Sequence, residues 1–417
     1  MTTTAAPEGW FAQTQVDDAE DARRRTRFPV GASISFDDMS LAGHEHRLDE
    51  LRAAEPVSWV PALGGWLITD RELARTLLLP KSGGSVQAHE NLVRASTGTH
   101  MLTVDDPEHT RVREPFEVPF RAREAEQRFA AFITEQTAAL LDAMTAAGTQ
   151  AELISAFAAP FAVTVAAEVI GLPLGEHGRI DGIYTAFAEG MVYDGDPQRQ
   201  INADAAREQL DTILLAALER RRRDPDGSLT SEVMVRADGL SDAEIVAQLR
   251  VVMFGAIETI QASVSNTVMY LLLDPPLVHE VRGDDALLAG AVDESIRLMP
   301  PVAFIERWMR DDLELGGVVL PRGEFVGISV LATNRDPAVF IDPQRFDPRR
   351  DNARKGLSFS GGEHHCLGVH LARLQTQAAL RGILDRLPGL RLVELDPPSG
   401  FAFRRPGRLV VAWDADA

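Results

Sequence analysis

The chain has 417 residues, of which 45% are apolar, and its 42 basic and 62 acidic residues give a net charge of −20. A field of that sign repels nucleic acid, which excludes a nucleic-acid-binding function. The single cysteine, Cys366, excludes an internal disulfide and any metal site made of several cysteines. The most apolar run, 157–174, is interrupted by two prolines and a glutamate, so it predicts a core helix and not a membrane span. Residues 1–7 lack the start of a signal peptide, and we expect a cytoplasmic protein.

The organisation of the chain favours one large domain. Its densest break, 223–228, is only as long as a loop. Residues 1–30 are rich in charges, including a basic cluster at 23–27, and we expect them to be loosely ordered. A single folded domain is therefore expected over residues 31–417.

The hydrophobic periodicity predicts a mainly α protein with a small β part. A short helix comes first, followed by two strands in which apolar and polar residues alternate and which a glycine-containing turn connects. Helices dominate afterwards, until short strands and irregular chain are expected from about residue 300 onward, with one further helix among them. The predicted helices lie at 44–54, 122–147, 203–223, 241–273 and 367–387, and the predicted strands at 57–60, 65–69, 391–395 and 408–413.

The helix at 241–273 is the longest predicted element and carries polar residues in an apolar setting. Ser241 and Glu244 form a capping box at its start, and two prolines follow its end. At 1.5 Å per residue it would be about 48 Å long and would cross the whole molecule. Glu258 and Thr259 lie in its middle, where a buried carboxyl and hydroxyl need a reason.

The segment 359–368 around Cys366 has the composition of a thiolate site. Two glycines precede the cysteine, one follows it, and a predicted helix starts directly afterwards. A helix N-terminus favours an anion, and glycine lets the backbone approach a flat ligand closely. Zinc is the alternative, but His364, His365 and Cys366 are consecutive and can hardly all reach one tetrahedral ion.

The same segment resembles the haem-binding signature of the cytochrome P-450 family, Phe-x-x-Gly-x-x-x-Cys-x-Gly. Ser360 stands where that family commonly has glycine. The resemblance implies the cytochrome P-450 fold, with the long helix over a haem b cofactor and Cys366 as the axial ligand of its iron. It also implies that His364 contacts a haem propionate. The fixed positions of the signature are occupied by Phe359, Gly362, Cys366 and Gly368.

Two other parts of the chain resemble propionate contacts of that family. His109 and Arg113 are spaced i, i+4 on a predicted helix, and Arg307 resembles a further propionate arginine. With His364 they would give four donors for two buried carboxylates. His109 and Arg113 could equally be two exposed basic residues.

The middle of the long helix, 255–259, resembles the family's oxygen-binding groove. The resemblance implies that Glu258 and Thr259 deliver protons during the activation of O2, and that the small Ala256 faces the haem. Ala256 and Ile260 depart from the residues most usual at their places. The structural alternative for Thr259 is a hydrogen bond from its hydroxyl to the carbonyl four residues earlier.

A buried structural triad is also implied. Glu294 and Arg297 resemble the family's Glu-x-x-Arg pair, and residues 343–346 resemble a later element that would bring Arg345 to it. Ion pairs at this spacing are common on helix surfaces, so the pair alone carries no information.

The activity implied is that of a haem-thiolate monooxygenase, which inserts one oxygen atom of O2 into an apolar small molecule in secondary metabolism or catabolism. A ferredoxin and a ferredoxin reductase would supply electrons, and basic residues just before the cysteine segment would receive the ferredoxin, unless they merely offset nearby acids. A peroxide-dependent peroxygenase and a catalytically silent haem-binding partner protein are the alternatives. Substrate contacts would fall near 84–96, 187–193, 302–304 and 399–401, and the basic residues are Arg349, Arg350, Arg354 and Lys355.

Overall fold

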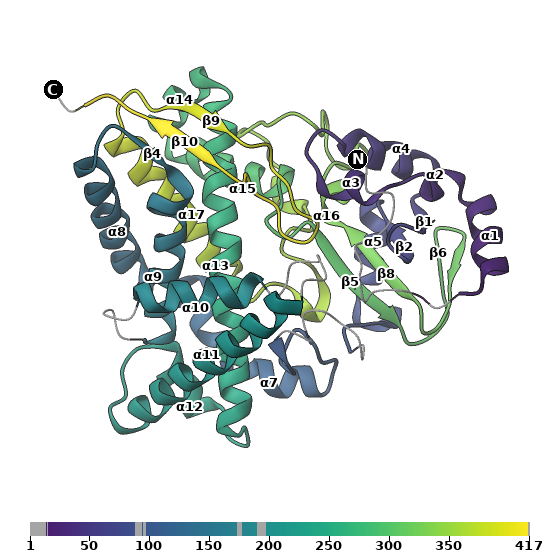
Figure 1. Cartoon of the computed structure of the whole chain (residues 1–417), viewed down its shortest axis with the longest axis horizontal. Helices are drawn as coiled ribbons and strands as arrows, with labels where there is room; N and C mark the ends of the chain where they lie inside the picture. The colour runs from purple at the N-terminus through teal and green to yellow at the C-terminus, as the bar shows by residue number, and fades with distance from the viewer. Residues whose placement is uncertain are drawn as a thin grey trace.

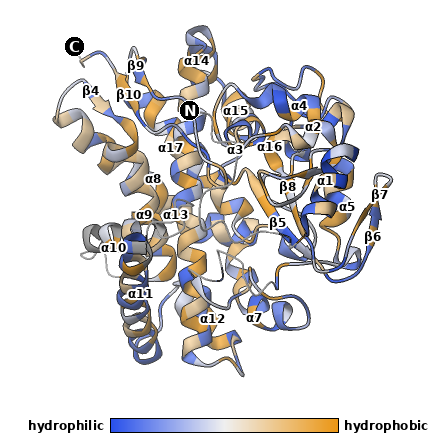
Figure 2. Ribbon diagram, turned by 45° about the vertical axis from the view of Figure 1, so that its right-hand side comes forward, coloured by the Kyte–Doolittle hydropathy of each residue, from blue (hydrophilic) through white to orange (hydrophobic). Residues whose placement is uncertain are grey.

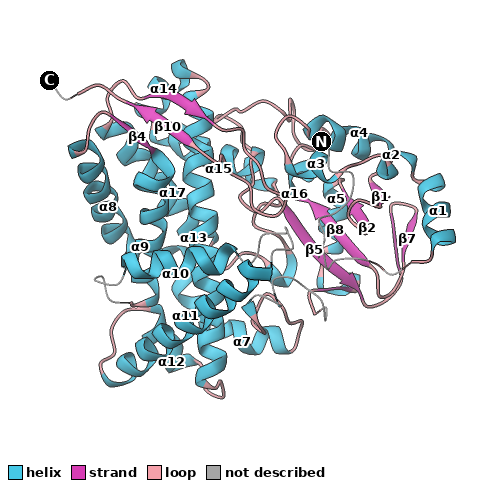
Figure 3. Ribbon diagram, in the orientation of Figure 1, coloured by secondary structure: helices cyan, strands magenta, loops and turns pink. Residues whose placement is uncertain are grey.

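The elements fall into a helical part and a part built around one small sheet (Figure 1, Figure 3). The structure is a computed structural model that describes residues 14, 16–87, 94, 97–172, 177–189 and 197–415. The helices of eight or more residues are α1 (Asp18–Arg27), α4 (Glu45–Ala54), α7 (Glu108–Glu117), α8 (Ala122–Ala146), α9 (Ala159–Ile170), α10 (His177–Glu189), α11 (Pro197–Arg223), α12 (Leu229–Arg236), α13 (Asp242–Leu272), α14 (Pro275–Arg282), α15 (Asp285–Leu298) and α17 (Val369–Arg386). The shorter ones are α2 (Pro29–Ala32), α3 (Phe36–Ser40), α5 (Arg71–Leu77) and α16 (Val330–Thr333).

Helix α13 is the central element of the helical part, as its sequence predicts. The Ser241 hydroxyl accepts a hydrogen bond from the Glu244 N–H, and the Glu244 carboxylate accepts one from the Ser241 N–H. Most side chains of α13 are buried against α9, α11, α15 and α17. Figure 2 shows hydrophobic colouring along much of α13 and hydrophilic colouring along much of α11. The outer helix therefore shields the inner one from water.

The main sheet has five strands. Its order is β1-β2-β8-β5-β3, with β2 and β8 parallel and the other pairs antiparallel. A second sheet has the order β4-β10-β9, and β6 pairs with β7. The strands are β1 (Val57–Val60), β2 (Gly65–Ile68), β3 (Gly84–Ser85), β4 (Gln150–Glu152), β5 (Phe304–Met309), β6 (Leu313–Leu315), β7 (Val318–Leu320), β8 (Phe325–Ser329), β9 (Arg391–Leu395) and β10 (Leu409–Ala412).

The N-terminal segment differs from its prediction, because residues 18–30 are folded and packed. Arg24 of α1 lies over the rings of Trp59 and Trp66, 4.6 and 5.1 Å from their centroids. Its guanidinium also donates two hydrogen bonds of 2.8 Å to Glu324. A paired arginine stacked on two indoles anchors a charged helix to the sheet. The expectation of loose order is thus wrong for residues 18–30, while residues 1–13 lie outside the described part.

The remaining predicted elements agree with the structure to within a few residues, apart from an earlier start of α11. No helix in the described part of the chain is long and apolar enough to cross a membrane.

Candidate active site

A cavity of about 350 Å³ separates the middle of α13 from the cysteine segment. Most of its lining is apolar and comes from segments far apart in the sequence, among them Met101, Val302, Phe304 and Phe403. The sequence-predicted site residues that line it are Arg113, Ala256, Thr259, Phe359, His364, Cys366 and Gly368. The others, His109, Glu258, Arg307 and Gly362, are not among the lining residues.

The cysteine segment makes a tight turn where the signature has glycine. Gly362 has a φ of +66°, and a Cβ on it would lie 2.0 Å from the carbonyl oxygen of Leu78. Ser360 also adopts a positive φ, of 60°, which is the region that glycine occupies without strain. The Cys366 N–H then donates to the Phe359 carbonyl at 2.9 Å, which closes the turn. This backbone path leads Cys366 to the wall of the cavity.

The surroundings of Cys366 suit a metal-bound thiolate. Burial raises the pKa of its thiol, whereas the backbone N–H of Gly368 and the charges of Arg113 and Arg373 lower it. Metal coordination deprotonates a thiol outright, and N–H groups directed at the sulfur stabilise its negative charge. Without a metal, burial would keep this side chain a neutral thiol.

Four basic side chains from three separate segments meet at one end of the cavity. Helix α7 supplies His109 and Arg113, β5 supplies Arg307, and the cysteine segment supplies His364. The ring centroids of His109 and His364 lie 4.3 Å apart, and both side chains are buried. Arg113 Nη2 donates to the His365 carbonyl at 2.7 Å, which ties α7 to the cysteine segment. The alternative that His109 and Arg113 are exposed is therefore wrong.

This group has hydrogen-bonding capacity that no described residue uses. His109 Nε2 and both ring nitrogens of His364 have no hydrogen-bond partner within the described residues. Burial and the charges of Arg307, His109 and Arg113 lower the pKa of His364 to about 2. Burial also lowers the pKa of Arg307 to about 10. Two carboxylates of a ligand would supply acceptors and offset the buried positive charge.

The cavity walls leave room for a flat ligand. A Cβ on Gly255 of α13, or on Gly368 beside the cysteine, would meet no atom within 4 Å. A thiolate on one wall, unmet donors at one end and open space between two glycines fit a haem. The residues of this chain therefore fit the cofactor that the sequence implies.

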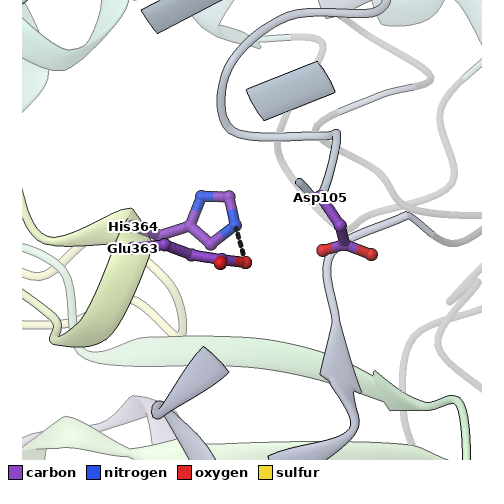
Figure 4. A group of neighbouring side chains, drawn as sticks. All are labelled: Asp105, Glu363 and His364. Atoms are coloured by element: carbon purple, nitrogen blue, oxygen red, sulfur yellow. Dashed lines mark ion pairs between the residues drawn. The ribbon is translucent and has the colours of Figure 1, made fainter. Parts of the chain in front are cut away.

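Asp105, Glu363 and His364 form a second cluster at the basic end of the cavity (Figure 4). Their potential ligand atoms lie within 4.8 Å of one another, and His364 Nε2 lies 3.4 Å from Glu363 Oε1. The Asp105 carboxylate already accepts a hydrogen bond from Ser85 and one of 3.1 Å from the Val86 N–H. Sequence reasoning missed both acids, although each lies close in sequence to a predicted donor. Cys366 is not part of this cluster, so the structure does not gather the residues of the zinc alternative.

The polar residues of α13 lie on different sides of the helix. Thr259 lines the cavity. Its hydroxyl donates to the Gly255 carbonyl at 2.5 Å, so the bond to the carbonyl four residues earlier, expected as the structural alternative, is present. The hydroxyl oxygen can still accept a hydrogen bond from the cavity side. Burial raises the pKa of Glu258, and the charge of Arg405 opposes that shift. Glu258 therefore keeps its proton to a higher pH than an ordinary carboxyl group.

The buried triad contains Arg350 in the place predicted for Arg345. Arg297 Nε donates to Glu294 at 2.7 Å, and Arg350 Nε donates to the same carboxylate at 2.9 Å. The side chain of Arg345 is exposed, and only its carbonyl takes part, by accepting from Arg297 Nη2 at 3.3 Å. The prediction was wrong because the chain turns the backbone of residue 345 toward the triad. Three arginines lie within 345–350, and the sequence gives no signal for which one points inward.

The basic stretch before the cysteine segment is mostly engaged within the chain. Arg345 and Lys355 are exposed and form no ion pair with any described residue. Only these two charges of the stretch are uncommitted, and Arg350 is excluded as an exposed contact. The three paired residues are Arg349 with Glu280, Arg350 with Glu294, and Arg354 with Asp293.

The predicted substrate-contact regions are partly outside the described residues, which omit 88–93, 95–96 and 190–193. Val302 and Phe304 line the cavity as expected. Ala402 and Phe403 line it just beyond the predicted region 399–401. The sequence carries no signal for Met101, because an apolar residue on a cavity wall has the same pattern as a core residue.

Comparisons with known proteins give a consistent result. The family model described as cytochrome P-450 matches residues 198–388. The chain is 33% identical to cytochrome P-450 107B1 of Saccharopolyspora erythraea, over 86% of this chain and 91% of that protein. It is 32% identical to the mycinamicin IV hydroxylase/epoxidase of Micromonospora griseorubida, over 90% and 96%. Among solved structures it is similar to the myxobacterial cytochrome P-450 CYP267B1 in complex with myristic acid, with a TM-score of 0.81, 28% identity, and 90% and 97% coverage.

Proposed function

The chain belongs to the cytochrome P-450 family and is a monooxygenase, and we propose that it oxidises an apolar secondary metabolite with electrons from a separate ferredoxin and ferredoxin reductase. The observation that carries this proposal is the apolar cavity with Cys366 on one wall and Thr259 on the other. Such a cavity holds a substrate next to a reacting centre and keeps water away from both. We also propose that the protein works in the cytoplasm.

We assign haem b to this cavity, with Cys366 as the axial ligand. His109, Arg113, Arg307 and His364 would hold its propionates through charge-assisted hydrogen bonds. When bound, the haem supplies the iron chemistry that activates O2, which a thiolate ligand favours.

Thr259 and Glu258 are the proposed proton carriers. The Thr259 hydroxyl lines the cavity and can pass a proton between a buried donor and a bound reactant. Burial raises the pKa of Glu258, so this carboxyl group is a proton donor over a wider pH range than a free one. The acid–alcohol pair favours O2 with reductive electrons over the peroxide-dependent alternative.

The substrate class follows from the lining and from the relatives. Apolar side chains such as Val252, Phe304 and Phe403 line the space beside Thr259. One relative is named for the hydroxylation or epoxidation of mycinamicin IV, and one similar structure holds myristic acid. These two compounds are therefore suitable first probes, and a shift of the haem from low spin to high spin would report their binding.

The test combines a spectrum with turnover. Carbon monoxide added to the reduced protein should give the red-shifted Soret band of a thiolate-ligated haem, and a histidine-type spectrum in fresh protein would overturn the assignment. A surrogate ferredoxin and its reductase should then support oxidation of the better-binding probe. Turnover with hydrogen peroxide alone would identify the peroxygenase, and turnover with neither oxidant would favour the silent partner protein.

A matched variant tests the proton carriers. Thr259→Ala should keep the spectrum and probe binding, while product formed per NAD(P)H consumed falls to about a tenth. An unchanged ratio would remove Thr259 from the proton path.

A further inference from the structure

A buried tyrosine reaches the backbone of α13 at the acid–alcohol segment. Tyr184 lies on α10, has 1% of its surface exposed, and donates from its hydroxyl to the Phe254 carbonyl at 3.4 Å. Burial and the nearby Glu258 charge raise the pKa of Tyr184, so the hydroxyl keeps its proton and acts as a donor. In a regular helix, the Glu258 N–H has the Phe254 carbonyl as its partner. The tyrosine hydroxyl thus shares the Phe254 carbonyl with the Glu258 N–H.

The next rung of α13 is also engaged by a hydroxyl. Thr259 donates from its side chain to the Gly255 carbonyl, which in a regular helix accepts only the Thr259 N–H. A side chain that enters the hydrogen-bond ladder is a recognised cause of helix bending. The two rungs that hydroxyls share are those of Glu258 and Thr259.

An aromatic cluster connects Tyr184 to the wall of the cavity. Tyr184 packs near Phe187, which meets Phe254 edge-on at 6.2 Å between centroids. Phe254 in turn meets Phe403 edge-on at 5.3 Å, and both of these rings line the cavity. A ligand that presses on Phe254 or Phe403 would therefore act on the packing of α10 as well.

We propose that Tyr184 is a positioning residue for the proton carriers, whose hydroxyl sets the backbone of α13 at Glu258 and Thr259 according to the position of α10. The inference rests on the proposed function, because it assigns Tyr184 a part in that reaction. Tyr184 does not line the cavity, so it acts through α13 and does not contact the substrate. A ligand that fills the cavity would thereby fix the position of α10, and α10 would in turn fix the positions of Glu258 and Thr259.

The decisive variant is Tyr184→Phe, which removes one oxygen atom and keeps the ring. Tyr270→Phe is the matched control, because Tyr270 is a tyrosine of α13 itself that stacks on Phe346 at 4.8 Å. It is twelve residues, or about 18 Å, from Glu258. Hydrogen exchange of the amides at 255–260 in the ferric holoenzyme needs no turnover. We expect it to be about fivefold faster in Tyr184→Phe, the factor that corresponds to one net hydrogen bond, and unchanged in Tyr270→Phe.

The second measurement is product formed per NAD(P)H consumed, with myristic acid or mycinamicin IV as the probe. We expect the ratio to fall several-fold in Tyr184→Phe while the KM for the probe and the carbon monoxide spectrum stay at wild-type values. Added to Thr259→Ala, the change should cause no further fall, because both act on one proton path.

The outcomes separate this inference from the function it rests on. Wild-type exchange at 255–260 in Tyr184→Phe would overturn the claim that the hydroxyl holds the backbone of α13, whatever the enzyme does in turnover. Faster exchange with an unchanged product ratio, in an enzyme that Thr259→Ala does uncouple, would overturn the positioning role and leave the monooxygenase proposal intact. Absence of turnover in the wild type would instead count against the proposed function, and the exchange result would still decide whether the hydroxyl holds α13.

Discussion

Cys366 and Thr259 lie on opposite walls of one cavity, but the two walls are held in place by different means. The cysteine wall depends on backbone geometry, with Gly362 in a conformation and a space that admit no side chain, and on the buried charges of the Glu294 triad. The α13 wall depends on apolar side chains and on hydroxyls that share backbone hydrogen bonds. The first arrangement tolerates few residue types, whereas the second can be varied to suit a substrate.

Removing the cysteine should have the largest effect of any single change. Cys366→Ser should abolish the thiolate spectrum of the carbon monoxide complex and reduce turnover to background, because the ligand that donates electron density to iron is lost. Ser360→Gly is the control in the same turn. It should keep the spectrum and raise the free energy of unfolding by about 1 kcal/mol, because glycine adopts the positive φ without strain. A thiolate spectrum in Cys366→Ser would contradict the assigned ligand.

The triad gives the largest expected effect on stability. Arg350→Leu should lower the free energy of unfolding by about 3–5 kcal/mol, because it leaves the fully buried Glu294 without one of its two cationic partners. Arg345→Leu should change it by less than about 0.5 kcal/mol, since that side chain is exposed. Denaturant unfolding of the two variants measures the difference, and equal losses would show that residue 345 belongs to the triad after all.

For the α13 wall, we expect the product formed per NAD(P)H consumed to depend on pH. Burial raises the pKa of Glu258, so the carboxyl group is protonated below that raised pKa and ionises as the pH increases through it. Product formed per NAD(P)H consumed should therefore fall with rising pH in the wild type. In Glu258→Gln the ratio should be low at every pH, because an amide does not release a proton. A pH profile of Glu258→Gln that matches the wild type would exclude this carboxyl group as the donor.

The smallest effect is expected on the surface beside the cysteine wall. Arg345→Glu combined with Lys355→Glu should slow the first reduction by an acidic ferredoxin and weaken the dependence of that rate on salt. These two charges are chosen because neither is paired within the described part of the chain. Arg222→Glu combined with Arg223→Glu, at the exposed end of α11, is a control of the same charge change. Reduction that is independent of salt and unchanged in the double variant would place the ferredoxin elsewhere.

The same difference between the walls decides how well each was predicted. The turn at Gly362 follows from local sequence, since backbone conformations restrict residue types at fixed spacing, and the same short segment carries the signature that implies Cys366 as ligand. The four donors at the basic end were also predicted singly, from motifs that each lie within a few residues. Tyr184 left no such signal, because the hydrogen bond that it makes is to the backbone of a helix 70 residues away.

The sequence by itself determined the helical fold and the capped central helix α13, and its resemblance to the family pointed to the cysteine segment and to the acid–alcohol pair. Periodicity, capping and short motifs all involve residues close in the chain. Only the tertiary structure decided that Arg350 and not Arg345 completes the triad, that α1 is anchored by Arg24, and which rings line the cavity. These outcomes depend on which of several similar side chains points inward, and that is set by packing between segments that are distant in sequence.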